Sequence, residues 1–367
     1  MTERNPLRLG FFIQPVHPPA RSYADVLRED RDAVVLADRL GYREAFIGEH
    51  LFDAAETITS SLAFIAHMAD ACPSITFGTG VLPLANYHPA MAAAQVAMVD
   101  HLVQGRLVLG IGPGVPGDAE AIGDLGTDRK RKTQEAIEHM LRIWSEEPPY
   151  RIGGDFYRTT TERSLNRQIG VGIAARPLQR PHPPIAITSI RPDGPGPQAA
   201  GSRGWTGISA TYVGAHVVRA HIEGYLQGRR STGLSADPSG WRVARSVFVA
   251  DDEATARDYA HRADGAHGFY FHVMRTKLAS VGLLDVMGDH SGQSDAELSP
   301  RRCLERLVIA GTPESVAEQI LALRRSVGAF GTLLYTGHDW SDPALARRSM
   351  ELMAREVLPR INRARDD

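Results

Sequence analysis

The chain has 367 residues and a formal net charge of −2 at pH 7, which fits two domains or one large α/β barrel and argues against a general nucleic-acid binder. Its hydrophobic fraction of 43% and charged fraction of 23% are ordinary for a globular protein. The two cysteines are too few for a disulfide framework and have no metal-ligand spacing. Because no apolar run suits a signal peptide or a membrane span, we expect a cytoplasmic protein without membrane contact.

Short apolar runs alternate with amphipathic helical patterns along the chain. We expect strands at 8–12, 44–48, 75–82, 107–111, 184–188, 204–209, 241–250 and 330–335. We expect helices at 23–40, 60–71, 88–102, 129–144, 216–227, from Asp251 or Asp252 onward, and at 344–357. Parallel strands covered by helices on both faces read as near-continuous apolar runs, as these do. The pattern predicts one (β/α)8 barrel, with a doubly wound sheet plus a second domain as the alternative.

Two polar or irregular segments interrupt this alternation and are interpreted as insertions in a single domain that spans 1–367. They lie at about 146–182, after the fourth strand, and at about 263–300, after the seventh strand. Within the second insertion, the segment HGFYFH at 267–272 could form one wall of a substrate pocket. A helix that packs its aromatic side chains against the barrel is the alternative for that segment.

The stretch GIGPGVPGD at 110–118 contains the glycine spacing of a dinucleotide-binding loop. That fingerprint needs a helix that begins within the loop, and the pattern predicts no helix before about Asp128. We therefore expect a glycine-rich turn at the carboxyl end of a barrel strand, where a planar ligand can approach the backbone closely. A tight turn without ligand contact is the alternative.

Four motifs, taken together and in this order, carry a resemblance to a known family. Glu49-His50-Leu51-Phe52 follows the second strand, and GTGVLPLANYHPA at 78–90 follows the third. QGRL at 104–107 leads into LGIGPG, and GTPESV at 311–316 precedes a helix. The chain resembles the bacterial luciferase-like, flavin-dependent monooxygenases over nearly its whole length. It is more similar to hydroxylating or epoxidising members, of the limonene monooxygenase type, than to luciferase.

The resemblance implies reduced FMN at the carboxyl end of a TIM barrel and a separate flavin reductase that supplies it. It also implies O2 as co-substrate, a flavin C4a-(hydro)peroxide that transfers one oxygen atom to a small organic molecule, and a homodimer. The protein would bind and orient the cofactor and exclude water. An oxidoreductase that uses the deazaflavin F420 on the same barrel is one alternative, and a non-catalytic flavin-binding barrel is another.

The resemblance places His50 in the flavin pocket as the catalytic residue, acting as hydrogen-bond donor or general base. The luciferases carry two adjacent histidines here, whereas this chain has Leu51 in the second place, which sets it apart from light-emitting chemistry. The resemblance places Glu49 at the cofactor too. A structural histidine, and a buried carboxylate that holds the end of the barrel, are the alternatives.

Flavin contacts are also implied at the ends of the third and fourth strands. Thr79 and Gly80 lie where the family often carries a non-prolyl cis peptide beneath the flavin ring, with a bulge-forming glycine as the alternative. Asn86 is expected at the pyrimidine edge of the flavin, or else as a helix cap. Gly112 stands where luciferase has a cysteine near the reactive flavin carbon, and it is expected to leave room for a bulky substrate.

The FMN phosphate needs a cation, since Pro113 takes the place of luciferase's phosphate-binding arginine. Arg131, within the basic run 129–132, matches best, and a solvated basic helix face is the alternative. Thr188 and Ser189 end the fifth strand before a Pro/Gly loop, where hydroxyls and free backbone N–H groups suit a phosphate. Ser209, which ends the sixth strand, is expected nearby.

Overall fold

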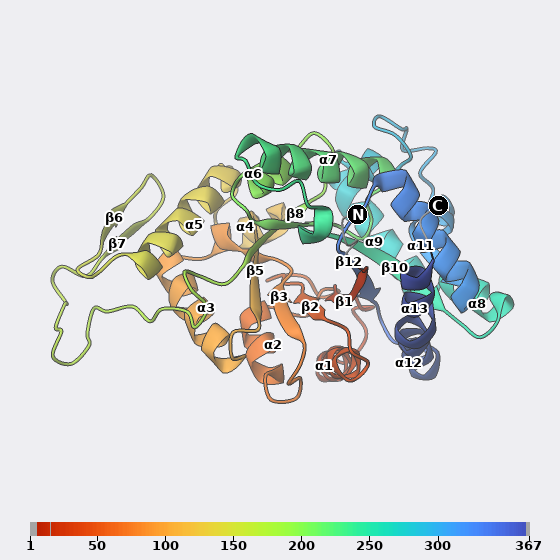
Figure 1. The fold of residues 1–367 in the computed structure, drawn as a ribbon, viewed down its shortest axis with the longest axis horizontal. Coiled ribbons are helices and arrows are strands. Elements are labelled where there is room, and N and C mark those ends of the chain that lie inside the picture. Colours follow the sequence, from red (N-terminus) through yellow and green to blue (C-terminus); the bar gives the residue numbers. More distant parts are fainter. Residues whose placement is uncertain (1–5, 15, 365–367) are drawn as a thin grey trace.

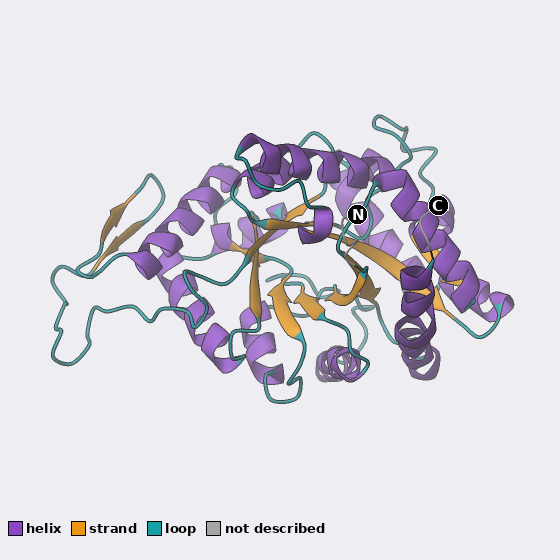
Figure 2. Ribbon diagram, viewed as in Figure 1, coloured by secondary structure: helices purple, strands orange, loops and turns teal. Residues whose placement is uncertain are grey.

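The protein is described by a computed structural model that covers residues 6–14 and 16–364. Eight parallel strands form a closed barrel with helices around its outside (Figure 1, Figure 2). The barrel strands are β1 (Arg8–Ile13), β2 (Glu44–Ile47), β3 (Thr76–Thr79), β5 (Leu107–Gly112), β8 (Ile185–Ser189), β9 (Thr206–Ser209), β10 (Trp241–Val249) and β12 (Thr332–Gly337). The ring closes because β10 pairs with both β9 and β12, and β12 pairs with β1. The predicted (β/α)8 barrel is therefore confirmed.

Alternate residues of the strands point into the barrel, and the middle layer of this interior is apolar. That layer consists of Phe12, Phe46, Val108, Ala186, Ile208, Ala244 and Leu334. Nearer the amino-terminal ends of the strands, Arg242 Nε donates to Glu44 Oε1 over 2.6 Å. The barrel is thus a packed core without a pore, and the carboxyl ends of its strands are where a site can form.

The surrounding helices begin at side-chain caps that the sequence supplies. Ser22 caps α1 and Asp252 caps α8, while His88 caps α3, with Pro89 in its first turn. These helices are α1 (Tyr23–Arg39), α2 (Ser61–Met68), α3 (Pro89–Leu102), α5 (Arg129–Ser145), α6 (Gly196–Ser202), α7 (Ala215–Ser231), α8 (Glu253–His261), α11 (Pro313–Val327), α12 (Pro343–Leu352) and α13 (Leu358–Arg363). A short 3-10 turn, η1 (Leu84–Asn86), and the two-residue strand β4 (Leu82–Pro83) lead into α3.

Two elements differ from the sequence prediction. The expectation of no helix before Asp128 is wrong, because α4 (Pro116–Ala121) begins inside the glycine stretch, with its proline in the first turn. An additional strand, β11 (Val308–Gly311), pairs with the carboxyl half of β10. It escapes the sequence pattern because it directly follows α10 (Pro300–Leu307) without a turn residue between them.

The two interrupting segments form distinct structures. Segment 146–182 contains the hairpin of β6 (Arg151–Gly153) and β7 (Arg158–Thr160), which projects from the body at the left of Figure 1. Segment 263–300 contains α9 (Ala266–Ser280) and the 3-10 turn η3 (Leu284–Met287). None of the helices in the described part of the chain combines the length and hydropathy needed to cross a membrane.

Candidate active site

Most of the expected site residues lie at the carboxyl ends of neighbouring barrel strands. His50 follows β2, Gly80 follows β3, Gly112 ends β5 and Thr188 lies one residue before the end of β8. These strands are consecutive neighbours in the sheet. In a parallel barrel this end carries the active site, because the loops that follow the strands converge there.

His50 is held between two carboxylates from different segments. Its Nε2 lies 3.2 Å from Glu56 Oε2 and its Nδ1 lies 3.5 Å from Asp118 Oδ2 on α4. Burial alone would lower the pKa of His50, but these two carboxylates raise it to about 10. An imidazolium at neutral pH can donate hydrogen bonds and cannot accept a proton. The raised pKa therefore argues against the general-base role, and both ring nitrogens already face carboxylates.

Asp118 also fixes the backbone beside His50. Its Oδ1 accepts from Leu51 N over 3.0 Å and from Phe52 N over 3.3 Å. The short helix α4 thus binds the loop after β2 through one side chain. Its hydrogen bonds and the charge of His50 outweigh the effect of burial and lower the pKa of Asp118.

The cofactor contact expected of Glu49 does not fit its surroundings. Its Oε2 accepts from Ser61 N over 2.8 Å and from Ser61 Oγ over 2.6 Å, and its Oε1 accepts from Tyr87 Oη over 2.6 Å. Burial raises the pKa of Glu49, and these donors oppose that rise. Both oxygens are therefore engaged in joining the β2 loop to α2 and to the segment before α3.

The Gly80–Val81 peptide bond is cis, as the resemblance implies. Beside it, Thr79 Oγ1 donates to Gly110 O over 2.6 Å and is buried, so this hydroxyl joins β3 to β5. The expectation that Gly112 leaves room for substrate needs correction. A Cβ at Gly112 would lie 2.7 Å from Val81 Cγ2, so the side chain of Val81 already fills that space.

The structure places Arg129, and not Arg131, beside Asn86 and the loop after β5. Arg129 donates through Nε to Pro113 O over 3.0 Å, through Nη2 to Asn86 Oδ1 and through Nη1 to Asp124 Oδ2 over 2.9 Å, and its side chain is 13% exposed. Arg131 points away, pairs with Asp155 near the hairpin and is 64% exposed. Two residues along an α-helix correspond to a rotation of about 200°, which explains the opposite directions. The expected cap role of Asn86 is taken by His88.

Thr188 points into the barrel, whereas Ser189 and Ser209 point to its outer face. The register pairs Thr188 with Ile208, which faces the interior, so Thr188 faces the interior as well. Ser189 pairs with Ser209 on the outer face of the barrel, and its Oγ would lie 3.3 Å from a Cβ at Gly196, the first residue of α6. Ser209 Oγ is bonded at 3.0 Å to each of its two partners, His221 Nδ1 and Trp241 Nε1. The expected cofactor contact of Ser209 is thus replaced by a structural role under α7.

Helix α9 packs against the carboxyl end of the barrel. Tyr270 Oη donates to Gln14 Oε1 over 2.8 Å, and Gln14 Nε2 donates to the sulfur of Met274 over 3.4 Å. Tyr270 and Phe271 are both fully buried. The aromatic segment 267–272 therefore belongs to a helix packed on the barrel, and its buried side chains keep water from this end.

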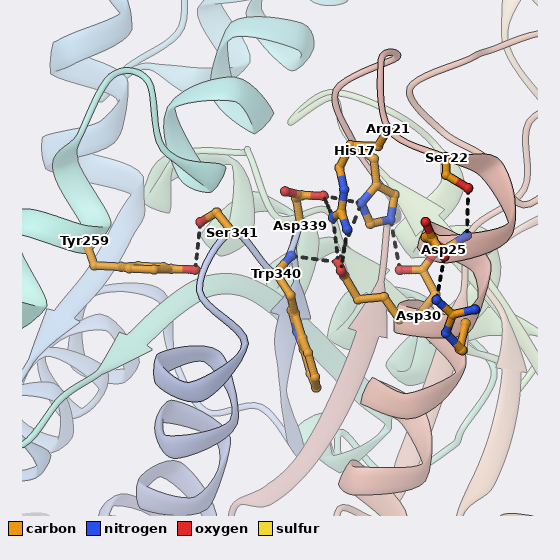
Figure 3. A network of polar contacts seen from close by, with 11 residues as sticks. His17, Arg21, Ser22, Asp25, Asp30, Tyr259, Asp339, Trp340 and Ser341 are labelled. Atoms are coloured by element: carbon orange, nitrogen blue, oxygen red, sulfur yellow. Dashed lines mark hydrogen bonds and ion pairs between the residues drawn. The ribbon is translucent and has the colours of Figure 1, made fainter.

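A second buried charge network joins β1, α1 and the end of β12 (Figure 3). His17 Nδ1 lies 2.6 Å from Asp339 Oδ1, His17 Nε2 lies 3.0 Å from Asp30 Oδ1, and Arg21 binds Glu29 and Asp339. Burial alone would lower the pKa of His17, but Asp30 and Asp339 raise it to about 9. Although His17, Glu29 and Asp339 could together face a metal ion, the charges of His17 and Arg21 already neutralise the carboxylates. The network therefore holds together the segment after β1, helix α1 and the segment after β12.

Four residues of the site are absent from the sequence-based set. Arg129 belongs to the basic run, and a helical wheel that starts at the cap residue Asp128 could have singled it out. Asp118 lies inside the glycine stretch and would be found only by expecting a helix from Pro116. Glu56 and Lys277 form an ion pair across 221 residues of sequence, and no local pattern connects them.

A closed parallel barrel with a histidine and unpartnered polar groups at the carboxyl ends of its strands has the arrangement of a TIM-barrel enzyme. A family model described as luciferase-like monooxygenase matches residues 7–329, and the chain belongs to that family. The resemblance in the sequence is therefore confirmed.

Several named proteins are similar over almost the whole chain. The 4-hydroxyprotoasukamycin monooxygenase of Streptomyces nodosus subsp. asukaensis is 29% identical, covering 98% of this chain and 94% of its own. The limonene 1,2-monooxygenase of Rhodococcus erythropolis is 28% identical, covering 96% and 86%. A solved structure of the oxygenating constituent of 3,6-diketocamphane monooxygenase from Pseudomonas putida, a type II Baeyer-Villiger monooxygenase in complex with FMN, aligns with a TM-score of 0.85 at 26% identity. That alignment covers 97% of this chain and 99% of the other.

Proposed function

We propose that this chain is the oxygenating component of a two-component monooxygenase that binds reduced FMN and uses O2 to oxidise a small organic substrate. The observation that carries the proposal is that two of the buried polar atoms without partners among the described residues, Thr188 Oγ1 and Asn86 Nδ2, lie at the carboxyl end of the barrel. A buried polar atom without a partner is costly, so such atoms at a strand end indicate a missing ligand. FMN in the similar 3,6-diketocamphane enzyme supports the choice of cofactor.

These residues suit the two polar ends of FMN. Asn86 Nδ2 can donate to a flavin carbonyl, while Arg129, which is paired with Asp124, holds the Asn86 side chain through its Oδ1. Ser189, at the end of β8 beside Gly196, offers a hydroxyl to the phosphate. Glu49 and Ser209 are left out of this set because their polar atoms are already bonded within the protein.

His50 acts in this proposal through its positive charge beside the reacting region, because both of its ring N–H groups face the carboxylates of Glu56 and Asp118. Reduced FMN, when bound, supplies the electrons that activate O2. The imidazolium, fixed by Glu56 and Asp118, can stabilise negative charge that develops on oxygen. Helix α9, packed on this end of the barrel, would limit the access of bulk water to the reduced cofactor and so its unproductive oxidation.

The proposal includes two protein partners, a separate flavin reductase and a second copy of this chain. The outer face of α3 exposes Met91, Met98 and Leu102 on a helix that is apolar on nearly all sides. The neighbouring segment 169–178, which belongs to the projecting insertion, exposes a further set of aliphatic side chains, namely Ile169, Val171, Ile173 and Leu178. Sedimentation of a dimer is expected, and a monomer at micromolar concentration would contradict this part of the proposal.

F420 is the second candidate cofactor because the barrel itself is shared with F420 enzymes. The F420-dependent tetrahydromethanopterin reductase of Methanopyrus kandleri aligns with a TM-score of 0.67 over 97% of this chain and 99% of its own, at 17% identity, which is a similarity of fold. Anaerobic fluorescence titration with reduced FMN and with reduced F420 separates the two. Binding of FMN in the micromolar range, weakened about tenfold by Ser189→Ala, supports the proposal. Tight binding of F420 without FMN binding contradicts it.

A further inference from the structure

Four alternating charges run from α9 to α4 across the loop that carries His50. Lys277 Nζ binds Glu56 Oε1 and Asp53 Oδ2, Glu56 Oε2 lies 3.2 Å from His50 Nε2, and His50 Nδ1 lies 3.5 Å from Asp118 Oδ2. The series is therefore cation, anion, cation, anion. The four members come from three parts of the sequence, since His50 and Glu56 share the loop after β2, and His50 lies in the interior of the series.

Glu56 is the buried centre of this arrangement. Its side chain is 2% exposed, while the side chain of Lys277 is 40% exposed and reaches inward from α9. A buried carboxylate is tolerated only when cations compensate it. Burial would raise the pKa of Glu56, but the charges of His50 and Lys277 and the hydrogen bond from Lys277 Nζ lower it to about 2. Loss of either cation therefore changes the electrostatic environment of the other.

Lys277 also lies on the face of α9 that turns toward the barrel. Tyr270, Met274 and Lys277 follow the i, i+4, i+7 spacing of one helical face. The first two contact Gln14 at the end of β1, and Lys277 reaches the loop after β2. One side of α9 thus joins two strand ends, and its only ionic link among the described residues goes through Glu56 and Asp53.

We propose that Glu56 and Lys277 are positioning residues, through which packing of α9 on the barrel mouth fixes the imidazolium of His50. The catalytic consequence rests on the proposed function of His50, whereas the geometric coupling stands by itself. The charged groups that face His50 are Glu56, Asp118 and, further away, Glu49 and Lys277. Glu56 raises the pKa of His50 and Lys277 lowers it, so removing the charge of Glu56 and removing the charge of Lys277 should shift that pKa in opposite directions.

The first test is a pH titration of the His50 imidazole by NMR in the flavin-free protein, with the signal assigned from His50→Gln. Removing the charge of Glu56 in Glu56→Gln is expected to lower the pKa of His50 by about 1–3 pH units. An unchanged pKa overturns the proposal, because Glu56 would then not act on His50.

The second test is hydrogen exchange in Lys277→Met, Lys277→Arg and the control Lys130→Met, which removes an exposed lysine of α5. Lys277→Met is expected to speed amide exchange in both 266–280 and 49–56, Lys277→Arg to restore it, and Lys130→Met to change neither segment. Faster exchange in α9 alone overturns the coupling. Neither test needs flavin, so failure of FMN binding would refute the proposed function and leave these results to decide the coupling.

Discussion

Replacement of Glu49 distinguishes a structural carboxylate from a cofactor ligand. Glu49→Ala leaves the buried N–H and O–H groups of Ser61 without their acceptor, and it also leaves Tyr87 Oη without one. Each buried donor left unpaired costs about 1–3 kcal/mol, so the two groups on Ser61 together cost about 2–6 kcal/mol. Since a domain is stable by only about 5–15 kcal/mol, this loss is large enough to measure.

The assay is urea unfolding, where a lower midpoint at an unchanged slope reports lost stability. Glu49→Gln keeps a carbonyl acceptor for Ser61 and is expected to cost less than half as much as Glu49→Ala. Glu318→Ala, which removes an exposed carboxylate from α11, is the matched control and is expected to stay within about 0.5 kcal/mol. If Glu49→Ala kept full stability and lost only flavin binding, the structural assignment of Glu49 would be refuted.

Three further results are expected. Gly112→Ala should cost about 1–3 kcal/mol of unfolding free energy through its clash with Val81, and less in a Val81→Ala background; an equal cost in both backgrounds would contradict the packing. Arg129→Gln should weaken FMN binding about tenfold in a fluorescence titration and Arg131→Gln less than twofold, and the reverse order would restore Arg131 as the phosphate contact. Burial lowers the pKa of His267 to about 3, so the unfolded chain takes up a proton that the native state refuses, and stability should fall as the pH drops below about 6.5. His267→Leu should reduce that fall, measured by urea unfolding at pH 7 and pH 5, by up to about 1.4 kcal/mol per pH unit, and an unchanged slope would contradict the assignment.

The barrel could be predicted from the sequence because its strands are apolar on both faces and stand out as short runs. All eight were located, from the strand at Arg8 to the one that ends at Gly337. The strand β11 was missed because no turn separates it from the helix before it. Periodicity therefore locates the barrel strands of this fold more reliably than the points where one element ends and the next begins.

The site could be predicted only at the level of strand ends. Side-chain direction alternates along a strand, so a one-residue difference separates Thr188, which faces the interior, from Ser189, which does not. On a helix, a two-residue difference exchanges the mostly buried Arg129, which contacts Asn86, for the exposed Arg131. Glu56, which contributes most to the charge around His50, could not be identified because its partner Lys277 is brought to it only by the tertiary fold.

The most direct test of the account is the reaction of the reduced complex with oxygen. The protein is mixed anaerobically with photoreduced FMN and then with oxygenated buffer in a stopped-flow spectrophotometer. We expect a transient spectrum that differs from both reduced and oxidised FMN and outlasts the reoxidation of free reduced flavin. Reoxidation at the rate and with the spectra of free flavin would contradict the proposed monooxygenase function.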